Sequence, residues 1–268
     1  MTDHQSKSPY TSKTSTPPTS PNRLPNLQAR PYRIRVSQRA KHVTIRVSHF
    51  AEVEVVIPPG FDQTHIPAIL EKRQAWLTRA LKRVEVARQS VSLEPIGALP
   101  ESICLRAIDQ EWHVHYCTTE DEGLSLHPSP PTQQLLISGQ VSQAESCKQV
   151  LRQWLSWQAK LHLTPWLRRV SQEVALPCGT VSIRGQKTLW ASCSNRKSIS
   201  LNYKLLFLPA PLVRYVFIHE LCHTIHLNHS ARFWALVAEK EPHYKPLDKE
   251  VSGAWCYVPD WVDCRLES

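Results

Sequence analysis

The sequence predicts an α+β protein, with a β-rich N-terminal region that includes one long helix and a C-terminal part in which a β-hairpin precedes a buried helix. Three patterns support this fold class. Apolar and polar residues alternate in short segments of the N-terminal half, apolar residues recur at helical spacing in 64–88, and the run 212–227 is almost wholly apolar. A chain of 268 residues can bury a substantial core, as one large domain or two small ones.

The first thirty residues differ in composition from the rest of the chain. They repeat Ser, Thr and Pro and hold few apolar side chains, so they cannot bury enough surface to offset the entropy of ordering. We therefore expect a disordered tail over 1–30 and a β-rich N-terminal region with one long helix over 31–144. Its predicted elements are strands at 32–36, 43–47 and 53–57, a helix over 64–88, and strands at 103–108, 112–117, 124–126 and 134–137.

The C-terminal half begins with a predicted helix over 145–175, in which Pro165 either kinks the helix or opens a second one. Pro211 suits the first turn of the apolar helix that follows the hairpin. We take 145–250 as one domain and 251–268 as a C-terminal extension without an assigned role. The predicted elements after the first helix are strands at 181–185, 188–193 and 199–207, the apolar helix over 212–227, and a helix over 231–241.

A histidine motif lies within this apolar helix. Residues 219–223 read His-Glu-Leu-Cys-His. Side chains four positions apart share one face of a helix, so His219 and His223 can bind one metal ion with Glu220 beside them. Buried imidazoles and a buried carboxylate need partners, and a metal ion supplies one. The spacing is typical of zinc hydrolases.

The third metal ligand is a choice between two later histidines. His226 stays near the same face only if the helix continues, and three ligands at i, i+4 and i+7 would spread over about 10 Å of helix axis, a poor match to a tetrahedral ion. His229 fits better if Asn228 adopts the left-handed conformation that ends helices and turns the chain back. We therefore expect His229 as the ligand and His226 as a packed histidine that supports the ligands.

Several segments in a fixed order carry a family resemblance. They are Arg184, Gln186, Lys187 and Trp190, then 192–194 with Cys193, then 199–202, the motif at 219–223, and 228–234. Together they resemble the YgjP-like metallopeptidase family of predicted metal-dependent hydrolases, which is related at the site to minigluzincin and SprT-like peptidases. The resemblance implies a zincin-like domain over 145–250 with one Zn²⁺ ion. It also implies that His219, His223 and His229 are the ligands and Glu220 is the catalytic carboxylate.

The mechanism expected from this ligand set is hydrolysis by a zinc-bound water. Three imidazoles leave one zinc position for water, whose pKa falls to about 7, and Glu220 would take its proton as general base. The residue that stabilises the oxyanion stays open among Arg184, Lys187 and Tyr244. Further candidates for contacts with the substrate or the ligands are Trp190, Cys193 and His226. A Cys193 nucleophile with a histidine base is the main rival arrangement.

Three functions are compatible with the sequence. The favoured one is a zinc-dependent metallopeptidase that acts on a peptide or protein. A metal-dependent hydrolase of a non-peptide substrate, such as a nucleoside triphosphate pyrophosphatase, fits less well, because phosphate hydrolysis usually employs Mg²⁺ with carboxylate ligands. The third is a binding protein that keeps zinc as a structural clip, which a fourth protein ligand would favour.

Charge and composition bound the partners and the compartment. The chain carries a formal net charge of +9, and its N-terminal region holds two basic groups: Arg33, Arg35, Arg39, Lys41 and Arg46, and Lys72, Arg73, Arg79, Lys82 and Arg83. A basic face attracts phosphate, so a DNA-associated SprT-like protease is a second hypothesis, beside the simpler interpretation of solvated surface charges. We expect no membrane segment, a cytoplasmic location and free thiols, since the sequence shows no apolar run of membrane length, no N-terminal apolar signal core and no C-x-x-C among eight cysteines.

Overall fold

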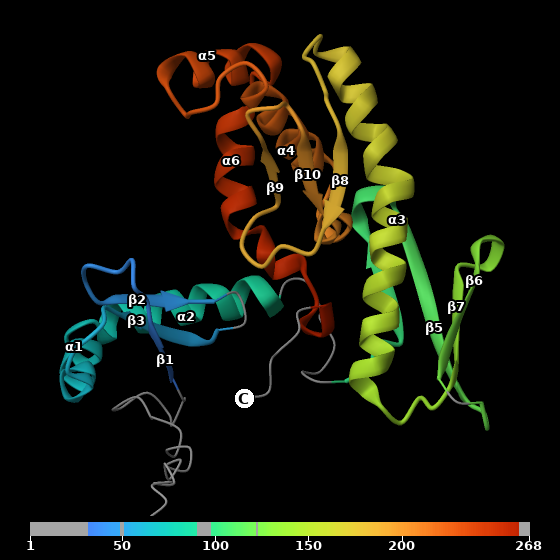
Figure 1. Ribbon diagram of the computed structural model, residues 1–268, viewed down its shortest axis with the longest axis horizontal. Coiled ribbons are helices and arrows are strands. Elements are labelled where there is room, and N and C mark those ends of the chain that lie inside the picture. Colours follow the sequence, from blue (N-terminus) through green and yellow to red (C-terminus); the bar gives the residue numbers. More distant parts are fainter. Residues whose placement is uncertain (1–31, 49–50, 90–97, 122, 263–268) are drawn as a thin grey trace, which may run out of the picture. The chain divides into compact units, whose positions relative to one another are not determined.

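The computed structural model describes residues 32–48, 51–89, 98–121 and 123–262 (Figure 1). The predicted tail over 1–30 and the end of the predicted extension, 263–268, lie outside the described residues. Contacts between residues divide the chain into two units, Met1–Leu81 and Lys82–Ser268, and each is described by itself. The domain limits expected from the sequence, at 144 and 250, stay a prediction. The α+β class is confirmed, since sheets and helices occur in both units.

Unit 1 is a three-stranded sheet covered by helices. Its strands are β1 Tyr32–Val36, β2 Thr44–Val47 and β3 Val53–Ile57, and β3 lies in the centre, parallel to β1 and antiparallel to β2. Alternate residues of β3 are buried with apolar residues of α1 (Ile66–Lys72) and α2 (Gln74–Gln89). One helix was predicted over 64–88, but α1 ends at Lys72. The backbone N–H of its C-cap, Arg73, is shared between the carbonyls of Ile69 and Leu70.

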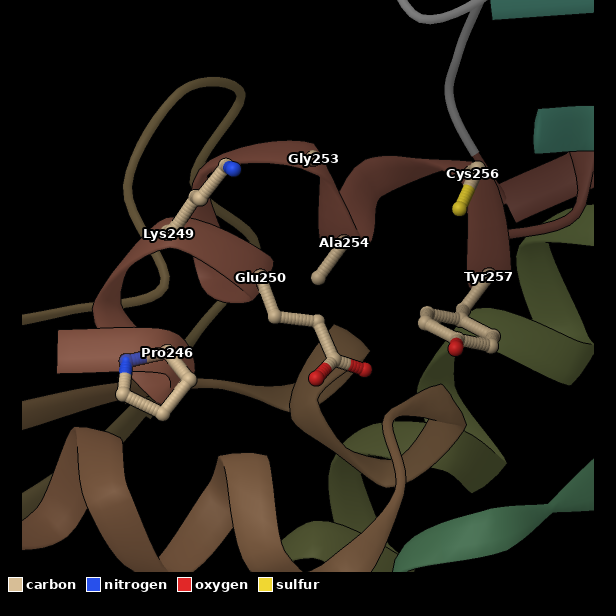
Figure 2. Close-up of a pocket in the computed structure, with 7 residues that line it drawn as sticks. All are labelled: Pro246, Lys249, Glu250, Gly253, Ala254, Cys256 and Tyr257. Carbon is tan, nitrogen blue, oxygen red and sulfur yellow. The ribbon is translucent and has the colours of Figure 1, made fainter. Parts of the chain in front are cut away.

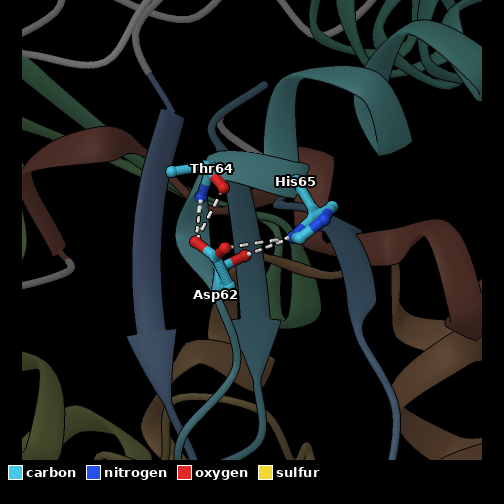
Figure 3. A network of polar contacts seen from close by, with 3 residues as sticks. All are labelled: Asp62, Thr64 and His65. Atoms are coloured by element: carbon cyan, nitrogen blue, oxygen red, sulfur yellow. Dashed lines mark hydrogen bonds and ion pairs between the residues drawn. The ribbon is translucent and has the colours of Figure 1, made fainter.

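The chain enters these helices through a capped turn at Asp62. Its Oδ1 accepts hydrogen bonds from the Thr64 backbone N (2.9 Å) and the Thr64 hydroxyl (2.7 Å), and its backbone oxygen lies 3.3 Å from Nδ1 of His65 (Figure 3). The bonds from Thr64 stabilise the ionised carboxylate and lower the pKa of Asp62. Asp62 is thus the N-cap of the short 3-10 helix η1, Gln63–His65.

Unit 2 begins with a four-stranded sheet and one long helix. The strands are β4 Ser102–Leu105, β5 Gln110–Thr118, β6 Leu124–Ser129 and β7 Gln134–Gly139, in the order β4-β5-β7-β6. The helix α3 spans Ala144–Glu173 and includes Pro165, so no second helix begins there. Buried residues on both sides of this proline, Leu163 and Leu167, hold the helix against the core.

A second sheet of three short strands precedes the C-terminal helices. Its strands are β8 Val181–Arg184, β9 Ala191–Cys193 and β10 Ile199–Asn202, with β10 in the centre, parallel to β8 and antiparallel to β9. The strand predicted over 199–207 ends at Asn202, because its side-chain oxygen accepts a hydrogen bond from the Lys204 backbone N (3.1 Å) and starts the 3-10 helix η4, Tyr203–Phe207. The remaining elements are α4 Ala210–His223, α5 Ala231–Lys240, α6 Tyr244–Gly253, η5 Ala254–Tyr257 and η6 Asp260–Val262.

A single core cluster joins both sheets of unit 2. It includes Val114 and Leu135 of the first sheet, Leu201 of the second, and Phe217 of α4. The helix α3 contacts β6 of the first sheet and β8 of the second (Figure 1). Four described residues of the C-terminal extension are buried in the same cluster: Ala254, Val258, Trp261 and Val262. None of the helices that can be described is long and apolar enough to cross a membrane.

Candidate metal centre

The helix that carries the histidine motif is buried on most of its surface. It follows Pro209 and has a proline in its first turn, as the sequence predicted for Pro211. Its apolar residues Val213, Phe217 and Leu221 have no exposed surface. This packing holds His219, Glu220 and His223 in fixed positions on one rigid element.

The helix ends earlier than the sequence predicted, at His223 rather than at 227. The hydroxyl of Thr224 donates to the Leu221 carbonyl (2.6 Å), and the backbone N–H of His226 bonds the Cys222 carbonyl. A hydroxyl that binds a backbone carbonyl in this way competes with the helical pattern. Asn228 does not take the left-handed conformation that we expected, so the chain turns back through 224–230 without it.

The structure brings three imidazoles together. Nε2 of His229 lies 3.2 Å from Nε2 of His223 and 3.1 Å from Nε2 of His219, and the ligand atoms of all three lie within 4.8 Å of one another. Zinc–nitrogen bonds of about 2.0–2.1 Å place tetrahedral ligand nitrogens about 3.3 Å apart. The two short distances therefore suit one tetrahedral cation.

His226 and His229 occupy different positions relative to the other two imidazoles. His226 supplies its backbone carbonyl, which lies 3.0 Å from Nδ1 of His223. A proton on Nδ1 that is donated to this carbonyl leaves the Nε2 lone pair of His223 free for a metal. His226 thus supports a neighbouring imidazole, while the ring of His229 completes the cluster.

Two aromatic residues of α5 surround the histidines, and sequence reasoning did not assign them to the site. Phe233 is fully buried, and its ring centroid lies 5.0, 4.4 and 4.8 Å from those of His219, His223 and His229. Trp234 stacks on His229 at 5.7 Å. The run 228–234 had entered only through the family resemblance. These contacts fix the ring planes of the three imidazoles.

Burial controls protonation at this site. It lowers the pKa of His219 to about 4, with further lowering by His223 and His229, and it lowers the pKa of His223. Both imidazoles are therefore neutral at pH 7, which is the form that binds metal ions. Burial also raises the pKa of Glu220 to about 8.

Glu220 supplies the clearest test of whether a cation fits. Its side chain is 7% exposed, and its Oε2 atom is buried with no hydrogen-bond partner among the described residues. A buried carboxylate without a partner is unfavourable, whereas a nearby cation with a coordinated water would satisfy it. The neutral imidazoles and the unpartnered carboxylate together fit one divalent ion.

Tyr215 and Asp248 adjoin His219 and were also missed as site residues. The Tyr215 hydroxyl donates to Oδ1 of Asp248 (2.7 Å), and the Tyr215 ring lies 6.1 Å from that of His219. The negative charge of Asp248 opposes the other effects on His219 by raising its pKa. The signal for Tyr215 was its position four residues before His219, on the same helix face.

The remaining candidates lie on the second sheet and on α6. Arg184 is exposed at the end of β8, and Lys187 is exposed in the loop after it. Tyr244 begins α6 and stacks on Trp234 at 5.6 Å. Because Trp234 also stacks on His229, stacked rings connect Tyr244 to His229. Trp190 is buried just before β9.

Cys193, on β9, does not have the properties of a nucleophile. Burial, followed by the negative charge of Glu220, raises the pKa of its thiol to about 11. A thiol with this pKa is protonated at pH 7, and the thiol form attacks poorly. The rival arrangement with a cysteine nucleophile thereby loses its support.

One cavity lies away from the histidines, at α6 and η5 (Figure 2). Its volume is about 390 Å³, and none of the three histidines lines it. The metal centre itself is open, since His229 is exposed. The residues around the cavity are Pro246, Lys249, Glu250, Gly253, Ala254, Cys256 and Tyr257.

Three arginines of unit 1 lie on its sheet. Arg33 on β1 and Arg46 on β2 both pair in register with Glu54 of β3, and Arg35 donates to Glu54 Oε1 at 3.0 Å. The three arginines are exposed, but Glu54 neutralises part of their charge. Nucleic-acid binding by this face stays a prediction.

Comparison with known proteins gives one family match and one solved structure. The YgjP-like metallopeptidase domain matches residues 41–252. The structure titled "Crystal structure of the metallopeptidase zymogen of Pyrococcus abyssi abylysin" is 26% identical, over 32% of this chain and 87% of that chain, with a TM-score of 0.29. No curated protein matches the chain.

Proposed function

The chain belongs to the YgjP-like metallopeptidase family, which implies metal-dependent peptidase activity, and on this premise we propose that it is a zinc-dependent peptidase. His219, His223 and His229 hold one Zn²⁺ ion, and Glu220 is the general base. The observation that carries this proposal is the placement of three Nε2 atoms, with that of His229 at 3.1 and 3.2 Å from the other two. Beside them is the buried carboxylate of Glu220, whose Oε2 has no hydrogen-bond partner in the described part of the chain.

The chemistry divides between the ion and the side chains. A zinc ion held by these histidines would lower the pKa of a coordinated water to about 7 and would polarise the carbonyl of the scissile bond. Glu220 accepts the proton of the attacking water and then donates it to the leaving amine. Burial raises the pKa of Glu220 in the metal-free protein, which makes its carboxylate a stronger base, and the positive charge of a bound ion would favour the ionised form that takes the proton. Phe233 keeps the imidazoles in place throughout.

The substrate backbone has a binding edge at β9. This strand pairs with β10 on one side and is the edge of its sheet in the part of the chain that the structure describes. It packs against α4, and Cys193 on β9 is close enough to Glu220 for the carboxylate to raise the pKa of its thiol. An extended peptide that adds to this edge gains backbone hydrogen bonds without a requirement for particular side chains.

For the oxyanion we select Tyr244 from the three candidates. It is connected to His229 by stacked rings through Trp234. Arg184 and Lys187 belong to β8 and the loop after it, and β8 lies across the central strand β10 from β9. A phenol hydroxyl near the ion can donate a hydrogen bond to the developing negative charge.

The two other functions receive less support. Three imidazoles are poor ligands for the Mg²⁺ ion that nucleotide hydrolysis usually employs. A purely structural zinc site usually has four protein ligands, whereas the cluster among the described residues has three. The missing fourth ligand leaves a position for water, which favours catalysis.

One experiment separates these functions. The purified full-length chain is analysed for metal and tested on peptides, unfolded proteins and nucleoside triphosphates, together with Glu220→Gln and the control Glu239→Gln, a carboxylate exposed on α5. We expect one zinc ion per chain, and peptide cleavage that is lost with a chelator and in Glu220→Gln but kept in Glu239→Gln. Cleavage of nucleotides alone, or full peptide cleavage by Glu220→Gln, would overturn the proposal.

A further inference from the structure

We propose that the segment after α6, Ala254–Val262, positions the edge strand β9 for substrate binding by means of a stacked pair of tryptophans, Trp255 and Trp190. This inference rests on the proposed function and names a device of the same site. The segment lies beyond the residues that match the family, which end at 252.

The two tryptophans connect the segment to the start of β9. Their ring centroids are 4.0 Å apart with an angle of 18° between the planes. The indole N–H of Trp190 also donates to the backbone carbonyl of Val251 (3.2 Å), in the last turn of α6. Trp190 immediately precedes Ala191, the first residue of β9. A displacement of Trp255 therefore acts on the residue that immediately precedes the strand.

The loop before Trp190 is held from its other side. The side-chain amide of Asn202 donates to the carbonyls of Gln186 and Leu189, both at 2.8 Å. At the start of the loop, a Cβ atom on Gly185 would lie 2.8 Å from Cε1 of Tyr203, so the backbone packs directly on that ring. The loop is thus fixed to β10 and η4, which leaves Trp190 as its contact with the C-terminal segment.

A buried lysine connects these two sides. Lys204 is 1% exposed, and its Nζ lies 5.4 Å from the ring centroid of Trp255 and 3.4 Å from the Gln186 carbonyl. A buried ammonium group needs compensating partners, and an aromatic face together with a carbonyl provides them. Trp255 therefore shields a charge under the loop as well as stacking on Trp190.

The C-terminal end of the segment is anchored in the core. Trp261 is 4% exposed and packs edge-to-face on Phe207 at 6.4 Å. Its carbonyl accepts a hydrogen bond from Arg152 of α3 (3.2 Å). Because both ends are fixed, the segment cannot shift as a loose tail and can transmit the rigidity of the core to Trp190.

The consequence for catalysis concerns peptide length. A peptide that pairs along β9 uses the position of the strand relative to Glu220, whereas a short substrate that reaches only the metal does not. Loss of the tryptophan stack should therefore weaken the binding of long peptides and leave the chemical step nearly unchanged. This pattern identifies Trp255 as a positioning residue.

The test compares Trp255→Ala and Trp255→Phe in the full-length chain with the control Trp157→Ala, a tryptophan that is 51% exposed on α3. We expect Trp255→Ala to raise KM for an eight-residue peptide about tenfold, which corresponds to ~1.4 kcal/mol, with kcat and zinc content unchanged. For a three-residue peptide we expect KM to change less than about twofold, within the scatter of surface substitutions. Trp255→Phe, which keeps an aromatic face, should recover most of the loss.

Amide hydrogen exchange gives a second measurement that needs no activity. Trp255→Ala should speed exchange in 186–193 while exchange in α3 stays as in the wild type. Should the alanine variant fail to fold, Trp255→Phe and Lys204→Met are compared in the same way. Unchanged exchange in 186–193, or an equal change in KM for both peptides, would overturn the inference. A wild-type protein that cleaves no peptide would instead overturn the proposed function, with the exchange result still decisive for the position of β9.

Discussion

The buried carboxyl of Glu220 should make the stability of the metal-free protein fall as the pH rises. Burial raises its pKa from 4.5 to about 8. Between these two values the folded protein binds more protons than the unfolded chain, so the free energy of unfolding decreases with pH. The slope approaches ~1.4 kcal/mol per pH unit, and the whole window of about 3.5 units (8 minus 4.5) gives a loss of at most about 5 kcal/mol.

The histidines contribute with the opposite sign, in a lower window. Burial lowers the pKa of His219 from 6.5 to about 4, so the unfolded chain binds the extra proton and stability rises from pH 4 to 6.5. The pKa of His223 shifts in the same direction. The two effects oppose each other below pH 6.5, and only the effect of Glu220 remains between 6.5 and 8.

Urea unfolding of the chelated wild type and of chelated Glu220→Gln, at several pH values from 5.5 to 7.5, isolates this contribution. Gln has nearly the same shape and no charge, and Glu220 is not among the causes of the His219 shift, so the histidine contributions cancel in the difference. We expect the wild-type stability relative to the variant to fall by about 1 kcal/mol per pH unit. A difference that is independent of pH would show that Glu220 is solvated or paired in the metal-free protein, and would refute the reasoning.

Three further predictions concern the ligands, the oxyanion and the basic face. His229→Ala should abolish the binding of one zinc ion per chain. His226→Ala should retain it, because His226 contributes only its backbone carbonyl. Metal analysis after dialysis checks both variants, and zinc loss in His226→Ala alone would reverse the ligand assignment. Tyr244→Phe should lower kcat for peptides about a hundredfold with zinc content unchanged, since one hydrogen-bond donor to the oxyanion is lost. An unchanged kcat would exclude Tyr244 as the residue that stabilises the oxyanion. Binding of duplex DNA through unit 1 should weaken steeply as the salt concentration rises. Replacement of each of its three sheet arginines by Gln should reduce the slope of log affinity against log salt concentration by about one. No binding at low salt would end the nucleic-acid hypothesis.

The proximity of the three histidines follows from spacing and local geometry, and their role as metal ligands stays a prediction. The four-residue interval between His219 and His223 places them on one helix face whatever surrounds the helix. The preference for His229 over His226 followed from the size of a tetrahedral site compared with the rise of a helix. Both arguments depend on geometry that the sequence fixes locally.

The features that were missed depend on individual side-chain bonds or on distant parts of the chain. The hydroxyl of Thr224 ends α4 early, and the amide of Asn202 ends β10, although the apolar pattern continues past both. The stack of Trp190 on Trp255 and the bond from Tyr215 to Asp248 join residues far apart in the sequence. No spacing rule relates such pairs, so only the tertiary structure reveals them.

The origin of the three imidazoles has a consequence for metal affinity. Two of them project from a rigid, buried helix, while the third, His229, stands exposed on the turn that follows it. The turn brings His229 against Phe233 and Trp234, so the geometry of the three imidazoles depends on this segment as well as on the helix. A substitution in 224–228 that changes the course of the turn should weaken zinc binding although it alters no ligand, because it moves His229 away from the other two imidazoles. Affinity for the ion is thus adjustable from positions that never touch it.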